Sequence, residues 1–218
     1  MNIAQYITKE VHPLSPNDPV EFAQMLFKEL TFSHIPIVKD SELVGNLCEN
    51  DVQGFEANKP IHDYAFALDR FFVREQALWL SVLETFAQNE TNVMPVLDEN
   101  DRYLGYYELS EILSVFSETP FFNEPGGILV VEKGVKDYSF SEASQIVESN
   151  NGRLLGAFIS ETRGDVVQLT LKVSSTGLND IIQTFRRYSY EIVSGLDDDV
   201  YLKDLRERSE YLNKYLNI

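Results

Sequence analysis

Two carboxylates occupy equivalent positions in an internal repeat of this chain. Asp51 follows Gly45 by six residues, and Glu111 follows Gly105 by six residues. A carboxylate in the first turn of a helix is stabilised by backbone N–H groups that have no partner within the helix. Such a group either caps the helix or is held in place to accept hydrogen bonds from a ligand. The sequence leaves both interpretations open for Asp51.

Catalytic and metal-binding motifs do not occur in this sequence. It contains no G-x-S-x-G, P-loop, G-x-G-x-x-G or H-E-x-x-H pattern. The histidines His12, His34 and His62 lack the spacing of metal ligands. Cys48 is the only cysteine, so no internal disulfide can form, and no cationic neighbour in the sequence would activate its thiol. We therefore expect no catalytic residues and no metal site, and predict that the chain is not an enzyme.

The repeat has a period of about 60 residues, longer than the usual repeats of solenoid proteins. Pro36 and Pro95 lie 59 residues apart, and Gly45 and Gly105 lie 60 apart. Each copy has the pattern of an α-β-β-α unit after a short extended segment. One unit is too small for a core of its own, so the two copies should pack together. The predicted segments are 11–14, 19–30, 35–37, 43–44 and 51–55 in the first copy, and 71–73, 78–86, 93–97, 103–107 and 109–116 in the second.

Composition limits the classes of partner. The 218 residues carry a net charge of -17, and 44% of them are hydrophobic. Residues 1–117 hold 7 Lys/Arg against 19 Asp/Glu, a net charge of -12. Nucleic-acid binding needs clustered cations, so no nucleic-acid partner is expected. No apolar stretch approaches the ~20 residues of a membrane span, and the N-terminus does not resemble a signal peptide, so we expect a cytoplasmic protein without a membrane partner.

A different pattern follows the repeat. The Pro- and Gly-rich residues 118–127 predict a linker. Residues 128–196 predict β-α-β-β-α-β, the order of the ferredoxin-like split βαβ fold. Ser139 and Glu142 form a capping box at the start of its first helix. Leucines at 3-4 spacing predict an amphipathic C-terminal helix over 197–218. The predicted fold class is therefore α/β and α+β, with α-β-β-α units preceding the β-α-β-β-α-β domain.

The repeat resembles a pair of CBS domains, the nucleotide-sensing Bateman module, with copies at about 1–58 and 59–117. The resemblance rests on LSPNDPV from Leu14, SHIPIV from Ser33 and GNLCEND from Gly45, together with the duplication. Residues 128–194 resemble an ACT domain through the order of their elements, although the turn 132–138 lacks the family's Pro-Gly. The combination is similar to bacterial acetoin-utilisation-type CBS proteins.

The resemblance to CBS domains implies roles for individual residues. Asp51 would accept hydrogen bonds from ribose hydroxyls, and Cys48 stands where the family has Ser or Thr. Glu108 and Glu111 stand at the corresponding positions of the second copy, where a second carboxylate would repel phosphate. Residues His34, Ile35 and Pro36 would line the adenine slot, and Arg70 and Arg74 are candidates for phosphate contacts.

These roles predict a non-enzymatic regulatory protein that binds an AMP-like adenosyl nucleotide and needs no cofactor. The alternative is a ligand-free dimeric scaffold with degenerate CBS and ACT sites. The regulated protein partner is unknown. We expect a homodimer formed through the helices that carry Val52, Phe55, Ile112, Leu113 and Phe116.

Overall fold

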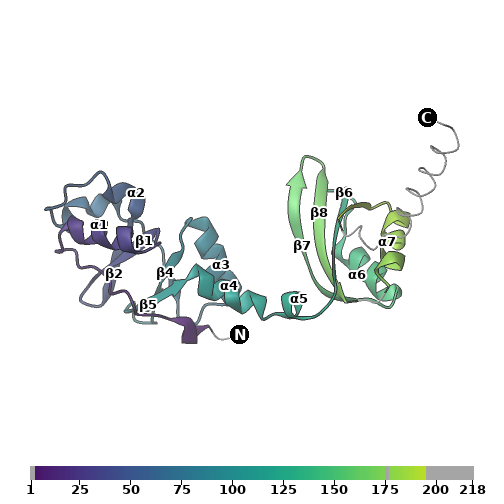
Figure 1. Ribbon diagram of the computed structural model, residues 1–218, viewed down its shortest axis with the longest axis horizontal. Coiled ribbons are helices and arrows are strands. Elements are labelled where there is room, and N and C mark those ends of the chain that lie inside the picture. The colour runs from purple at the N-terminus through teal and green to yellow at the C-terminus, as the bar shows by residue number, and fades with distance from the viewer. Residues whose placement is uncertain (1–2, 175–176, 195–218) are drawn as a thin grey trace, which may run out of the picture. The chain divides into compact units, whose positions relative to one another are not determined.

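The chain divides into two compact units, Met1–Phe116 and Ser117–Ile218. A computed structural model describes residues 3–174 and 177–194 (Figure 1). The helix predicted at 197–218 lies outside these ranges. Within them, no helix has both the length and the apolar composition needed to cross a membrane.

The first unit contains the two α-β-β-α copies that the repeat predicts. In the first copy, Asp40 and Ser41 have φ of 50° and 69°, which closes a tight hairpin of the kind that matches strand twist. The second hairpin has a longer turn, in which Asp98 Oδ1 accepts hydrogen bonds of 2.8 Å from the backbone N–H groups of Asn100 and Arg102. The first copy comprises α1 (Val20–Glu29), β1 (His34–Lys39), β2 (Glu42–Cys48) and α2 (Glu49–Val52), and the second comprises β3 (Val73–Arg74), α3 (Trp79–Gln88), β4 (Val93–Leu97), β5 (Tyr103–Glu108) and α4 (Leu109–Ser117).

The extended segment before each copy pairs with both copies. Leu14 forms a parallel bridge with Ile37 of its own copy, whereas Thr8 forms an antiparallel bridge with Tyr106 of the second copy. Asp69 correspondingly pairs antiparallel with Asn46 of the first copy, and β3 continues parallel to β4. Short 3-10 helices, Ala4–Tyr6 and Ile61–Ala67, precede these segments. The two copies therefore exchange their leading segments.

The exchange of leading segments explains why glycine occupies the same position in both copies of the repeat. A Cβ atom on Gly45 would lie 2.8 Å from Leu68 Cβ and 3.1 Å from the Asp69 carbonyl oxygen. A Cβ atom on Gly105 would lie 2.4 Å from the Thr8 carbonyl oxygen, and its φ is +146°. Only glycine permits so close an approach of two backbones. The repeated glycines thus mark where each exchanged segment crosses a hairpin strand.

Two hydrophobic cores result, and each includes residues from both copies. The first-copy core, around Ile35 and Leu47, also contains Val93 and Tyr106. The second-copy core contains Ile3 and Phe71 of the exchanged segments; its other buried members are Val73, Val82, Phe86, Met94, Val96, Tyr107, Ile112 and Val115. The copies therefore pack together as expected.

The helices proposed to form a dimer expose less apolar surface than predicted. Val52 is 1% exposed and Ile112 is 0% exposed, because both face the core beneath their own helix. Phe55 stacks on Tyr64 with ring centroids 3.9 Å apart, and Phe116 lies 5.5 Å from Trp79. Leu113 is 46% exposed. The prediction that Val52 and Ile112 lie on a dimer surface was wrong.

The second unit has the predicted β-α-β-β-α-β order. Ser139 Oγ accepts a hydrogen bond from the Glu142 N–H at the N-terminus of α6, which confirms Ser139 as the N-cap, whereas the Glu142 carboxylate accepts from Lys133 Nζ at 2.6 Å and does not complete the capping box. Its antiparallel sheet has the order β7-β8-β6-β9, and Val167, Leu169, Leu171 and Val173 of β8 are buried. The elements are β6 (Gly127–Gly134), α6 (Phe140–Ser149), β7 (Arg153–Arg163), β8 (Val166–Ser174), α7 (Leu178–Arg187) and β9 (Glu191–Ser194).

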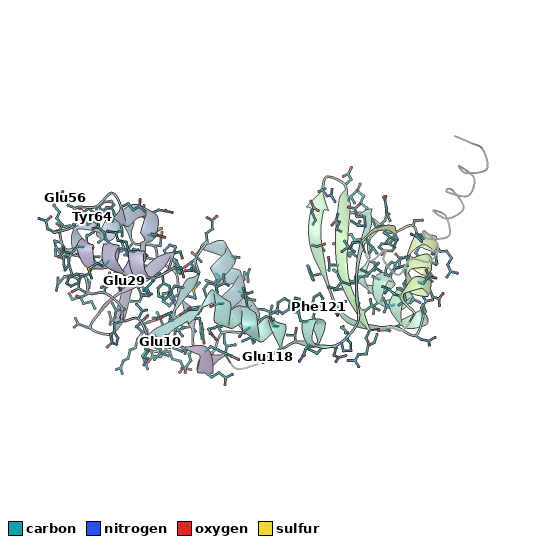
Figure 2. All side chains as sticks on the ribbon, viewed as in Figure 1. Glu10, Glu29, Glu56, Tyr64, Glu118 and Phe121 are labelled. Carbon is teal, nitrogen blue, oxygen red and sulfur yellow. The ribbon has the colours of Figure 1, made fainter. Side chains whose placement is uncertain are left out.

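The segment predicted as a linker contains a short helix, α5 (Pro120–Asn123). Pro120 occupies its first turn, where its fixed φ favours a helix and its missing N–H is not needed. Phe121, labelled in Figure 2, packs on β7 with its ring centroid 5.8 Å from that of Phe158. A Cβ atom on Gly156 would lie 2.5 Å from the Phe121 ring. This part of the linker therefore belongs to the second unit.

Candidate functional site

Asp51 lies at the start of α2, directly after the hairpin of the first copy. It is the third residue of this helix, and Cys48 occupies the N-cap position without a side-chain hydrogen bond. Among the described residues, the Asp51 carboxylate is exposed and has no hydrogen-bond or ion-pair partner. Asp51 therefore does not cap the helix. Its carboxylate remains available to a ligand.

His34 is the buried polar group of this site. It pairs with Cys48 across the hairpin, and its side chain is 8% exposed. Its Nε2 lies 3.4 Å from Asp69 Oδ2, and its Nδ1 shares a hydrogen bond of 2.9 Å with Ser33 Oγ. The Phe71 ring meets the imidazole edge-on, with centroids 5.1 Å apart. The exchanged segment thus supplies two of the contacts of His34.

The burial of His34 controls its protonation. Desolvation lowers the pKa of His34 below its ordinary value, because burial disfavours the charged imidazolium. The carboxylates of Asp69 and Asp51 act in the opposite direction and raise the same pKa. Since burial has the larger effect, the imidazole is neutral at pH 7. It can therefore donate one hydrogen bond and accept another.

Ile35 and Pro36, the other predicted slot residues, have different surroundings from His34. The Ile35 side chain belongs to the core beneath α1. Pro36 is buried, and its carbonyl oxygen accepts a hydrogen bond of 3.1 Å from the Leu14 N–H. In strand β1, alternate residues face opposite sides, so Pro36 and His34 share one face and Ile35 lies on the other.

The two copies meet where β1 and β4 begin. Asn92 Oδ1 accepts hydrogen bonds from the Ser33 N–H at 2.9 Å and from Ser33 Oγ at 3.1 Å. The Asn92 N–H donates to Ser33 Oγ at 3.0 Å, and Asn92 Nδ2 donates to the Thr31 carbonyl at 2.6 Å. Sequence reasoning missed this network. The available signal was that Ser33 and Asn92 each directly precede a repeated strand.

The second copy places acidic groups where the first copy has Cys48 and Asp51. Glu108 pairs with Val93 across the hairpin, and Glu111 is the third residue of α4. Burial raises the pKa of Glu108, and the carboxylates of Glu10 and Glu111 raise it further. Glu10, labelled in Figure 2, comes from the exchanged N-terminal segment. This end of the second hairpin therefore repels anions.

The two predicted phosphate contacts, Arg70 and Arg74, are not gathered at His34. Asp69 and Phe71 contact His34, whereas Arg70 and Phe72 line a groove on the other face of the same extended segment. Arg74 donates to Asp101 Oδ1 at 2.5 Å and to the Asp98 carbonyl oxygen. Sequence position alone could not show which residues of this alternating segment face His34.

The described part of the chain contains no cluster of three or more His, Cys, Asp or Glu residues that could hold a metal ion. The site around His34 is instead a set of hydrogen-bonding groups. Asp51 and Asp69 offer acceptors, and the neutral His34 offers one donor and one acceptor. Such a set suits a neutral polar ligand, such as one with adjacent hydroxyl groups.

Residues 3–56 match the family model of the CBS domain. This match supports the resemblance to a CBS domain over the first copy.

Two curated proteins are similar over a longer stretch. The inosine-5'-monophosphate dehydrogenase of Methanocaldococcus jannaschii is 24% identical over 147 residues, which cover 66% of this chain and 29% of that protein. The protein of the same name from Thermoplasma acidophilum is 21% identical over 140 residues, covering 64% of this chain and 29% of its own length. The chain thus spans less than a third of the length of these relatives.

A crystal structure of a CBS domain pair/ACT domain protein from Thermotoga maritima is also similar. Its TM-score is 0.49 and its sequence identity 16%, and the match covers 54% of this chain and 98% of that chain.

Proposed function

We propose that residues 1–117 form a regulatory CBS pair that binds an adenosyl ligand at the first copy. The free carboxylate of Asp51 is the observation that carries this proposal, because a ribose diol needs a fixed acceptor that the protein does not already use. The match of residues 3–56 to the CBS domain supports it. His34, Pro36 and Cys48 share the hairpin face beside this carboxylate.

The charge around this site favours a ligand with few phosphates. Asp51 and Asp69 both contribute negative charge to the surroundings of His34. Arg74 is held by Asp101, and Arg70 faces away from His34. A triphosphate would meet repulsion without a compensating cation. We therefore propose an AMP-like ligand rather than ATP.

The proposed role is sensing rather than catalysis. Ligand binding would favour one state of the CBS pair, and an ACT-like second unit would pair chains or relay that state to an unknown protein partner. We propose that the protein is a cytoplasmic homodimer. Because Val52 and Ile112 are buried, the exposed Leu113 and its neighbours would have to provide the dimer contact.

A ligand-free scaffold is the second candidate function. The hydrogen bonds between Ser33 and Asn92 favour it, because they already use polar groups at the start of both strands. The acidic groups at the second hairpin also favour it. In this alternative, the CBS fold would serve assembly, and nucleotide would not bind.

Calorimetry with AMP, ADP, ATP and S-adenosylmethionine tests the proposal. We expect AMP to bind more tightly than ATP. Asp51→Ala should weaken AMP binding by about tenfold or more, since a charge-assisted hydrogen bond contributes roughly 1.5–3 kcal/mol. The matched variant Glu111→Ala should leave AMP affinity unchanged, and Cys48→Ser should increase it because a hydroxyl is the stronger hydrogen-bonding group.

The same titrations decide between the two candidates. Asp51 does not cap α2, so Asp51→Ala should fold with nearly native stability, and a loss of AMP binding cannot be attributed to unfolding. Absence of binding by all four ligands at millimolar concentration, or an Asp51→Ala variant with native affinity, would favour the scaffold.

A further inference from the structure

A groove of about 600 Å³ lies beside the first hairpin. One wall is the tip of the hairpin, with Lys39, Asp40 and Glu42. The other wall is the exchanged segment, with Arg70 and Phe72. Its remaining lining comes from the start of β2, Leu43, Val44 and Gly45.

This groove is separate from the site around His34. The segment that includes Asp69 to Arg74 is extended, so its side chains alternate between two faces. Asp69 and Phe71 contact His34, whereas Arg70 and Phe72 line the groove. Phe71 is buried, whereas Arg70 and Phe72 on the groove face are exposed, as is Asp69 at the start of the segment. One segment thus forms a wall of both sites.

The cations of the groove are not engaged by the protein. Among the described residues, neither Lys39 nor Arg70 has an ion pair or a side-chain hydrogen bond. By contrast, Arg74 and Lys59 of the same unit are paired with Asp101 and Glu56. Residues 1–117 contain seven Lys/Arg residues in total and carry a net charge of -12. Two of these seven cations therefore line the same groove, and both are available to a ligand.

The anions of the groove are equally free. Asp40 and Glu42 have no ion pair among the described residues, although Lys39 lies on the same hairpin tip. The charges of the lining balance, with two cations and two carboxylates. A polyanion would be repelled by Asp40 and Glu42, and a simple cation by Lys39 and Arg70. A ligand that carries both charges can satisfy both pairs.

The apolar residues of the groove indicate what kind of uncharged group the ligand would carry. Phe72 is 42% exposed, and the Arg74 guanidinium lies 5.2 Å from its ring centroid. This cation–π contact restricts the aromatic ring without covering it. Leu43 and Val44 add aliphatic surface beside it. An apolar or aromatic side chain of a ligand could therefore pack here.

We propose that this groove binds an α-amino acid with an apolar or aromatic side chain. The planar guanidinium of Arg70 matches a carboxylate, with Lys39 as the second cation. Asp40 and Glu42 would accept hydrogen bonds from the ammonium group, and Phe72 would contact the side chain. The proposal is independent of nucleotide binding at Asp51.

Binding of L-phenylalanine to the full chain tests this site, measured by calorimetry and by NMR shifts of the amides around Phe72. Arg70→Met and Glu42→Gln should each weaken binding by about tenfold or more, because each removes a charge-assisted contact. Lys28→Met, which removes a cation on α1 that lies outside the groove and has no ion pair among the described residues, should leave affinity unchanged. Asp51→Ala should also leave it unchanged.

Two analogues test the zwitterion itself. 3-Phenylpropanoate lacks the ammonium group, and 2-phenylethylamine lacks the carboxylate. Both should bind at least tenfold more weakly than L-phenylalanine. Equal binding of 3-phenylpropanoate would overturn the assignment in favour of a simple anion site. No L-phenylalanine binding at millimolar concentration, or native affinity in Arg70→Met, would overturn the site altogether.

Discussion

At the end of its hairpin, the first copy places His34 opposite Cys48, whereas the second copy places Val93 opposite Glu108. Both hairpins have the same register shift after the fourth paired residue, and both lead into a helix whose third residue is acidic. The backbone is therefore repeated, but the chemistry is not. The difference teaches that the shared features, including the two glycines, maintain the exchange of segments. The differing features are the basis of our proposal that a ligand binds at the first copy and not at the second.

The mutation with the largest expected effect tests whether the two copies unfold as one cooperative unit. Leu47→Ala removes a fully buried side chain from the first-copy core and should lower the free energy of unfolding by about 2–5 kcal/mol. Trp79, the only tryptophan, packs on the second-copy core and reports its unfolding by fluorescence. We expect the urea midpoint from Trp79 to fall with Leu47→Ala, because the cores share residues.

The exposed Leu80, which is 60% accessible, provides the control. Leu80→Ala should change stability by less than about 0.5 kcal/mol. An unchanged Trp79 midpoint in Leu47→Ala would show that the two copies unfold independently.

The next effect concerns the contact between the copies. Asn92→Ala removes the acceptor of the Ser33 N–H and one of the partners of its hydroxyl, and should cost about 1–3 kcal/mol. A double-mutant cycle with Ser33→Ala should give a coupling energy of about 0.5–3 kcal/mol. Asn100→Ala on the second hairpin turn serves as the control. Additive effects of Ser33→Ala and Asn92→Ala would mean that these bonds do not hold the copies together.

The next prediction concerns the pH dependence of stability, to which His34 should contribute and its counterpart Val93 cannot. Burial lowers the pKa of His34 in the folded protein, so the unfolded chain binds the proton more readily. The stability associated with neutral His34 is thus present above the ordinary histidine pKa of about 6.5 and is lost as the pH falls below it. His34→Val, which copies the second repeat, should remove this part of the pH dependence. Thermal unfolding at several pH values measures it, and an unchanged slope between pH 5 and 7 would contradict it.

The smallest effect concerns Glu108. Its raised pKa means that the ionised carboxylate is less favourable in the folded state, so its ionisation reduces stability above that pKa. Glu108→Gln should therefore stabilise the protein at pH 7 by roughly 0.2–0.5 kcal/mol, the magnitude of a like-charge pair near a helix. The gain should vanish at low pH, where the carboxylate is protonated. Glu29→Gln on α1 is the matched control, and an equal gain there would indicate a general effect of net charge.

The sequence was informative where one local pattern determines the structure. Repeat spacing located both hairpins, and the capping box at Ser139 located a helix start. The exchange of segments could not be predicted, because it depends on which of two similar hairpins Thr8 and Asp69 pair with. Conversely, Val52 and Ile112 were assigned to a surface from their helix alone, although helical position does not show which face is covered.

The candidate site, like the fold, could be predicted from the sequence only where a local pattern determines it. Asp51 and His34 could be identified from their place in the repeat. The pairing of His34 with Asp69 could not, because it joins residues 35 positions apart on elements of different copies. The face of the extended segment on which Arg70 lies could not be predicted either. It depends on the register of that segment, which only the structure shows.

The pairing of Thr8 with Tyr106 has a consequence for synthesis. These residues are 98 positions apart, so the segment around Thr8 leaves the ribosome long before Tyr106 and must wait for nearly the whole first unit. At about 5–20 residues per second, that interval is roughly 5–20 s. During it, the edge of the N-terminal segment and the apolar side chain of Ile3 stay uncovered. Slow translation should therefore expose nascent chains of this protein to chaperones for longer than a fold with local strand pairs.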